Sequence, residues 1–209
     1  MKKLFYILSL PLLLAACAGS GSQASQDFTK FVNPFIGTDY TGNTYPGAQV
    51  PFGMVQLSPD NGLPGWDRIA GYFYPDSTIA GFSHTHLSGT GAGDLYDISF
   101  LPVTEPLSVA PDPLGIHSKF SHSNESASAG YYQVRLSDYD INVELTATQR
   151  CGIQRYSFPK GKQPIVLLNL AKAMNWDFTQ NTDIQIIDSV TIAGFRFSDG
   201  WARSKKLYF

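Results

Sequence analysis

Residues 81–97 read GFSHTHLSGTGAGDLYD and hold more chemically active side chains than any other stretch of the chain. His84 and His86 flank a threonine, three glycines alternate with small residues, and Asp94 and Asp97 close the run. A half-buried strand would be apolar at every second position, and a simple turn needs fewer glycines. Polar side chains on such a backbone are typical of a surface that touches a polar ligand closely.

His84 and His86 are two residues apart, so on a strand they would face the same way. Such a pair supplies half of many zinc or copper sites, but a metal needs three or four ligands. Asp94 and Asp97 are the nearest further candidates. Hydrogen bonding to sugar hydroxyls or to neighbouring loops is favoured, and metal binding and a purely structural role stay open.

The segment Gly65-Trp66-Asp67-Arg68 follows a cluster of turn-forming residues. A tryptophan beside an acid and a base on a loop suits a platform on which a sugar ring stacks. Asp67 would then hold Arg68 or a sugar hydroxyl. The alternative is a tryptophan that plugs the end of the fold.

The aspartates and glycines of the run allow two further interpretations. Gly89, Gly91 and Gly93 would cradle a phosphate only between a strand and a helix, and neither is expected there. Asp94 and Asp97 could form a carboxylate pair for glycoside hydrolysis, but their spacing on a loop does not set the separation that this chemistry needs. Aspartates that cap a turn are the commoner case.

The N-terminus has the features of a processing signal. Two lysines precede an apolar run that ends near Cys17. This run is shorter than the roughly 20 residues that span a bilayer. Leu-Ala-Ala-Cys resembles a bacterial lipobox, which implies a signal peptide at 1–16, acylation of Cys17 and an anchor in the cell envelope. A plain secretory signal is the alternative.

Residues 17–27 have the composition of a flexible tether. They hold no acidic cluster, which leaves both a periplasmic and an outer-membrane-associated location open. A net charge of −2 gives no basic patch for nucleic acid. With Cys17 acylated, Cys151 would have no disulfide partner, and we expect a small buried side chain there.

Residues 28–209 suffice for one domain with its own core. Short runs rich in Val, Ile, Phe and Tyr alternate with turn residues, and helical periodicity is absent, so we predict a mainly β fold, an antiparallel β-sandwich. Residues 33–93 should be rich in loops, because six prolines in this range would break regular strand pairing. The expected strands are 131–136, 141–148, 151–158, 164–170, 184–187 and 190–197. The last residues, 205–209, look like the opening of a further strand, so we expect the sequence to stop inside the domain.

Many segments resemble the N-terminal domain of glycoside hydrolase family 92. They include VNPFIGT at 32–38, YPGA at 45–48, VPFGM at 50–54, GW at 65–66 and GFSHTHLSGTG at 81–91. FSH at 120–122, AGYY at 129–132, ELTAT at 144–148, RYSFP at 155–159 and GWA at 200–202 follow in the same order. The glycine-rich His-Thr-His block is the most specific of these segments. Ala92, Leu95-Tyr96 and Gln154 depart from the family pattern, which puts loop contacts but not the fold in doubt.

The resemblance implies an inverting, calcium-dependent exo-α-mannosidase that acts on α-1,2-linked mannose or N-glycans. Inversion needs two carboxylates about 6.5–9.5 Å apart. In the family, these carboxylates and the calcium ligands lie in an (α/α)6 barrel, so no catalytic residue and no metal ligand is expected in this chain. The resemblance places Trp66 in the sugar pocket, with Asp67, His84, His86 and Asp94 as further candidates for substrate binding.

Two hypotheses of different classes follow. The chain is either the N-terminal part of an α-mannosidase, inactive without its barrel, or a lipid-anchored carbohydrate-binding module that captures mannosides without cleaving them. A degenerate fragment with unpaired sheet edges is a third possibility.

Overall fold

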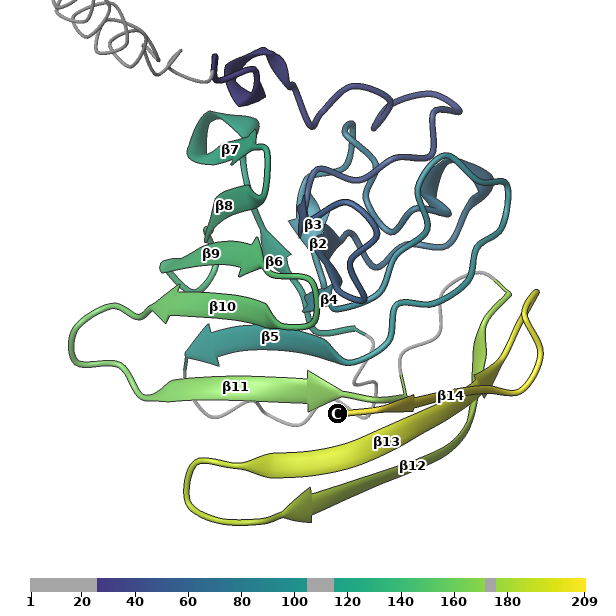
Figure 1. Ribbon diagram of the computed structural model, residues 1–209. Coiled ribbons are helices and arrows are strands. Elements are labelled where there is room, and N and C mark those ends of the chain that lie inside the picture. The colour runs from purple at the N-terminus through teal and green to yellow at the C-terminus, as the bar shows by residue number, and fades with distance from the viewer. Residues whose placement is uncertain (1–25, 105–114, 172–175) are drawn as a thin grey trace, which may run out of the picture.

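The computed structural model describes residues 26–104, 115–171 and 176–209 (Figure 1). The predicted signal peptide, Cys17 and nearly all of the tether lie outside these residues. Within the described ranges, no helix is long and apolar enough to cross a membrane. The helical segments are single 3₁₀ turns, η1 (Thr29–Phe31), η2 (Trp66–Arg68) and η3 (His122–Asn124).

Two antiparallel sheets pack face to face and form the body of the fold (Figure 1). The first has the order β1 (Ala48–Gln49), β2 (Gln56–Asp60), β4 (Gly81–Ser83), β5 (Ser99–Thr104) and β11 (Pro164–Asn169). The second has the order β10 (Gly152–Ser157), β9 (Ile141–Ala147), β8 (Tyr131–Leu136) and β7 (Glu125–Ser128). A two-stranded ribbon pairs β3 (Thr78–Ile79) with β6 (Ser118–Lys119).

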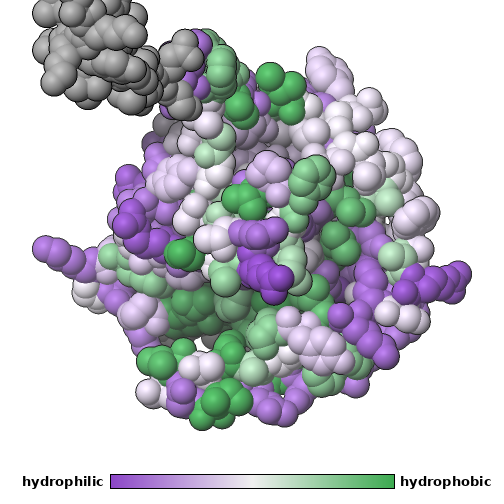
Figure 2. All heavy atoms as spheres, in the orientation of Figure 1, coloured by the Kyte–Doolittle hydropathy of each residue, from purple (hydrophilic) through white to green (hydrophobic). Residues whose placement is uncertain are grey.

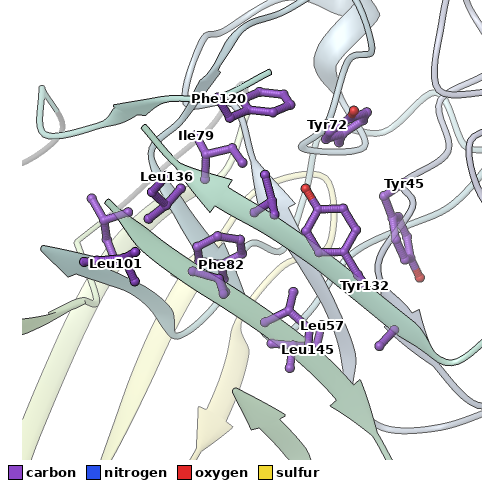
Figure 3. Close-up of a cluster of buried hydrophobic side chains, with 14 of the residues drawn as sticks. Tyr45, Leu57, Tyr72, Ile79, Phe82, Leu101, Phe120, Tyr132, Leu136 and Leu145 are labelled. Atoms are coloured by element: carbon purple, nitrogen blue, oxygen red, sulfur yellow. The ribbon is translucent and has the colours of Figure 1, made fainter. Parts of the chain in front are cut away.

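The alternation in β8 and β9 explains why the second sheet covers the core. Tyr132 lies opposite Leu145 and Val134 opposite Val143, and all four side chains are buried. The intervening residues face outward, as the two-residue period of a strand requires. The inward side chains meet Leu57 and others from the first sheet in one cluster (Figure 3). Figure 3 labels Tyr45, Leu57, Tyr72, Ile79, Phe82, Leu101, Phe120, Tyr132, Leu136 and Leu145 of that cluster.

A third sheet lies below the sandwich in Figure 1 and consists of β12 (Phe178–Ile186), β13 (Ile192–Asp199) and β14 (Lys205–Tyr208). Many of its apolar side chains are exposed, and Figure 2 shows apolar residues gathered at this lower end. The exposed set includes Phe178, Ile184, Ile186, Ile187, Val190, Ile192 and Tyr208. This third sheet is therefore a face on which apolar surface remains uncovered.

The predicted β-sandwich is confirmed, and so are the six predicted strands and the strand at the last residues. Two expectations were wrong. Cys151 is exposed rather than buried, because it ends the turn that Thr148 N closes on Cys151 O, one residue before β10 begins. Residues 33–93 are rich in loops, as predicted, but their prolines do not prevent strand pairing, because β1 to β4 lie in this range. Pro59 lies within β2, where β1 pairs only with Gln56 and Leu57 and so demands no N–H from the proline.

Candidate functional site

The backbone that follows Gly89, Gly91 and Gly93, which we call the glycine run, is strained. Leu95, Tyr96 and Ile98 have φ values of 83°, 64° and 56°. Positive φ is unusual for a residue with a side chain and a clear outlier for a β-branched one. Such strain persists only where the surroundings enforce it, and it collects at functional sites. Residues 95–98 are therefore held in place by other parts of the molecule.

Two sets of hydrogen bonds hold this segment from within the first half of the chain. The Tyr96 hydroxyl donates to the carbonyl of Ile69. The Thr85 hydroxyl donates to Asp97 Oδ2 at 2.8 Å and accepts from the Asp97 N–H at 2.9 Å. The threonine between the two histidines thus anchors the strained loop.

Arg196 anchors the same loop from the third sheet. Its side chain is 1% exposed, and its guanidinium forms ion pairs with Asp97 and Asp177. Its Nε donates to the Leu170 carbonyl at 3.0 Å and to Thr179 Oγ1 at 3.2 Å. A buried cation is tolerated when it is paired and its donors are satisfied in this way.

Lys205 extends the buried network from β14. Its ammonium contacts Asp94 Oδ1 and lies 2.8 Å from Asp177 Oδ1. The other oxygen of Asp94 accepts from the N–H of Ala202 at 2.9 Å. A Cβ on Gly200 would lie 2.4 Å from Asp94 Oδ1, so only glycine fits there. We name Asp94, Asp97, Asp177, Arg196 and Lys205 the charged cluster.

The charged cluster brings exposed tryptophans to the glycine run. Trp66 is 55% exposed and Trp176 is 48% exposed, and their ring centroids are 5.8 Å apart at 54°. Gly91 lies against the Trp66 ring, where an added Cβ would be 3.5 Å from the indole edge. Trp176 precedes the buried Asp177. Trp201, 74% exposed, lies between Gly200, which packs against Asp94, and Ala202, whose N–H donates to Asp94. All three tryptophans of the chain are therefore tied to this loop while their rings face solvent.

The Trp66 turn is held by an ion pair. Arg68 binds Asp76 through Nε at 2.6 Å and Nη2 at 2.5 Å, and its guanidinium lies 4.7 Å from the centre of the Phe73 ring. Hydrogen bonding to Asp76 raises the pKa of Arg68. The sequence offered Asp67 as a partner of Arg68 or of a sugar hydroxyl. The structure shows that Arg68 instead hydrogen-bonds Asp76. Asp67 is exposed beside Trp66, where it can still meet a ligand hydroxyl.

His86 is buried beneath the loop. Its Nδ1 donates to the Gln56 carbonyl at 2.7 Å, and its Nε2 lies 2.9 Å from Asp60 Oδ1 and 3.1 Å from Ser83 Oγ. Tyr45 and Tyr96 pack against the ring. Both ring nitrogens are engaged inside the protein, so the residue supports the loop from below.

His84 has a different environment. It follows β4, and its Nδ1 donates to the Ile98 carbonyl at 2.9 Å. The ring meets Phe100 edge-on, with centroids 5.6 Å apart. Burial lowers the pKa of His84, while the hydrogen bond to Ile98 opposes that shift. The two imidazoles therefore do not act as a pair, and His84 holds the last residue of the strained segment.

A metal site does not emerge from the residues that the structure describes. No group of three or more His, Cys, Asp or Glu side chains in 26–104, 115–171 and 176–209 is arranged to hold a metal ion. The carboxylates of Asp94, Asp97 and Asp177 are already paired with Arg196 and Lys205. These residues do not fit a calcium site, and the two aspartates of the run do not form a free carboxylate pair.

The structure separates the sequence candidates into two groups. Trp66 and Asp67 are exposed, whereas His86 and Asp94 are buried and His84 partly so, and these three support the loop. The sequence reasoning missed Trp176, Asp177, Arg196 and Lys205. One signal was present, because tryptophan directly before an acid occurs in both Trp66-Asp67 and Trp176-Asp177. Exposed aromatic rings beside polar loop groups suit the stacking of a sugar ring.

Comparisons with known proteins agree with this arrangement. Residues 31–209 match the glycosyl hydrolase family 92 N-terminal domain. A family GH92 α-mannosidase from Bacteroides thetaiotaomicron, BT3965, solved in complex with mannoimidazole, superposes with a TM-score of 0.82 at 38% identity, over 88% of this chain and 25% of that one. The family GH92 inverting mannosidase BT2199 of the same species gives a TM-score of 0.67 at 28% identity, over 86% of this chain and 24% of that one.

A curated sequence relative is a secreted glycosidase of Arthroderma benhamiae, described as uncharacterized. It is 28% identical over 195 residues, which cover 86% of this chain and 24% of the relative. The chain thus spans about a quarter of the length of the relatives it matches. With its sandwich fold and a family match that covers nearly all the described residues, the chain belongs to the N-terminal domain family of glycoside hydrolase family 92.

Proposed function

We propose that this chain is the domain that shapes the substrate site of an inverting, calcium-dependent exo-α-mannosidase, which hydrolyses α-1,2-mannosides or N-glycans. The observation that carries the proposal is the pair of exposed rings, Trp66 and Trp176, set against the glycine run. In this proposal one or both indoles stack on the C–H face of a mannose ring, and Asp67 binds a hydroxyl.

The chemistry itself belongs to residues outside this chain. The carboxylates of Asp94, Asp97 and Asp177 are held by cations, so they are not available as the acid and base of an inverting hydrolase. Calcium, which the family resemblance implies, would be held by ligands from the rest of the protein. The contribution of this domain is to place the sugar and to exclude water from one side of it.

The exposed apolar side chains of the third sheet support a second part of the proposal. Ile186 and Val190 are among the most exposed apolar residues described, and such patches mark interaction surfaces. We propose that this sheet packs against the (α/α)6 domain of the same protein. We further propose that acylated Cys17 anchors the protein to the membrane, in the periplasm or at the outer membrane.

The test uses the protein that carries this chain together with the rest of the length of its relatives, here called the full-length protein. With calcium present it should hydrolyse α-1,2-mannobiose, and ¹H NMR should detect β-mannose before mutarotation produces the α-anomer. A chelator should abolish turnover, and residues 1–209 alone should give none. Initial release of α-mannose contradicts inversion, and turnover by residues 1–209 contradicts the location of the acid and base. Binding without hydrolysis by the full-length protein supports a carbohydrate-binding module instead.

A further inference from the structure

The outer face of the four-stranded sheet, β10-β9-β8-β7, is hollowed. The hollow has a volume of about 570 Å³, which lies in the range of ligand sites. It lies on a different sheet from Arg196 and Lys205 of the charged cluster. Its lining is mainly polar and includes Asn124, Ser126, Gln133, Asn142 and Ser157.

The register of the strands places these polar side chains in rows. Gln133 of β8 lies between Ser126 of β7 and Glu144 of β9. The next row consists of Arg135, Asn142 and Ser157. Amide and hydroxyl groups both donate and accept hydrogen bonds. The rows therefore match a ligand whose groups also donate and accept, which is the chemistry of sugar hydroxyls.

The charges on this face are paired with one another. Arg155 binds Glu144 through Nε at 2.6 Å and Nη2 at 2.5 Å, and Arg135 pairs with Asp140. The hydrogen bonds from Arg155 hold the pKa of Glu144 below its usual range, so the acid stays ionised opposite its partner. With its charges compensated, the face favours a neutral ligand over an ionic one.

An adjoining hollow adds an apolar surface. It has a volume of about 220 Å³, shares Glu144 and Arg155 with the paired charges, and is lined by Tyr131 and Ile153. The Tyr131 hydroxyl donates to Glu144 Oε1 at 2.6 Å, which fixes the phenol ring. An aromatic ring and an aliphatic side chain next to hydrogen-bonding groups suit the C–H faces of a pyranose.

We propose that these two hollows form an accessory binding site for a neutral glycan chain, separate from the site at Trp66. Only the choice of an α-mannoside as the probe rests on the proposed function. The site would hold a long substrate on the enzyme without taking part in bond cleavage.

The experiment uses the full-length protein and an S-linked α-mannotetraose, whose sulfur bridges resist hydrolysis. Isothermal titration should find two binding sites per chain. The variant Gln133→Ala Asn142→Ala should lose at least tenfold in affinity at one of them, with unchanged turnover of α-1,2-mannobiose. The matched control Gln149→Ala Gln163→Ala, which removes two exposed side-chain amides from loops outside both hollows, should keep both sites. If the double variant is too unstable to test, Ser157→Trp, which places a large ring in the hollow, should cause the same loss of affinity.

Three results overturn the accessory site. One is affinity that neither the double variant nor Ser157→Trp changes. Another is loss of disaccharide turnover together with binding, which would make this face part of the main site. The third is equal binding of an oligogalacturonate, which would show that the face does not favour a neutral ligand. Failure of the proposed function would give a different result, because the disaccharide would not be hydrolysed although the hollow would still bind the tetraose.

Discussion

Single residues of the candidate site differ in whether they can meet a ligand, and burial decides this. Trp66 and Trp176 expose about half of their surface, whereas His86 engages both ring nitrogens inside the fold. A sequence pattern could single out Trp66, because the tryptophan lies in a turn-forming segment next to charged residues. It could not single out Arg196, whose partner Asp97 is 99 residues away along the chain. Only the folded structure brings those two residues together.

His84 gives a prediction about pH. Burial lowers the pKa of His84 in the folded state below the ordinary value of 6.5, so the unfolded chain binds the proton more readily. The stability that the neutral ring contributes is complete above about pH 6.5 and is lost as pH falls through the folded-state pKa. His84→Asn keeps a donor near the Nδ1 position and cannot titrate in this range. Its free energy of unfolding should therefore decline less than that of the wild type between pH 7 and pH 5.

The control for this comparison is His117→Asn. His117 is exposed and also bonds a backbone carbonyl, that of Gly115, through Nδ1 at 2.9 Å. Denaturant melts at several pH values measure the effect. If His84→Asn follows the wild-type pH dependence as closely as His117→Asn does, burial of the imidazole has no part in acid destabilisation.

At the scale of elements, runs rich in Val, Ile, Phe and Tyr between turn residues predicted β8, β9 and β13. The strands β1 to β4 were not predicted from the sequence, for two reasons. Three of them are only two or three residues long, and Pro59 interrupts the fourth in sequence without interrupting its pairing. Short strands of this kind owe their existence to neighbouring strands more than to their own composition.

The third sheet and the glycine run are joined through Arg196, which yields a stability prediction. Arg196→Met removes the cation and leaves Asp97 and Asp177 buried without it, which should cost about 3–5 kcal/mol in the free energy of unfolding. Arg135→Met breaks an ion pair in which both partners are about half exposed, and should cost less than about 1 kcal/mol. Chemical denaturation of the full-length protein, followed by tryptophan fluorescence, measures both. Equal small losses would mean that the charged cluster does not hold the loop.

At the scale of the whole molecule, composition and strand spacing predicted the sandwich, but not the uncovered apolar face of β12–β14. An alternating run such as 184–187 has the same pattern whether its apolar side is covered by the same domain, by another domain or by solvent. The arrangement of the site could be predicted only in outline. The loop and Trp66 were found from the sequence and its resemblance to family 92, while the second indole and the cations depend on packing between the two halves of the chain.

The central claim is that this domain binds the mannose ring through its exposed indoles. The most direct test is the kcat/KM of full-length Trp66→Ala on α-1,2-mannobiose. Loss of stacking and packing should lower kcat/KM by an amount worth about 1–3 kcal/mol, and Trp66→Phe, which keeps an aromatic face, should recover most of it. Wild-type kinetics in Trp66→Ala would contradict the claim and would leave Trp66 as a structural residue at the end of the sandwich.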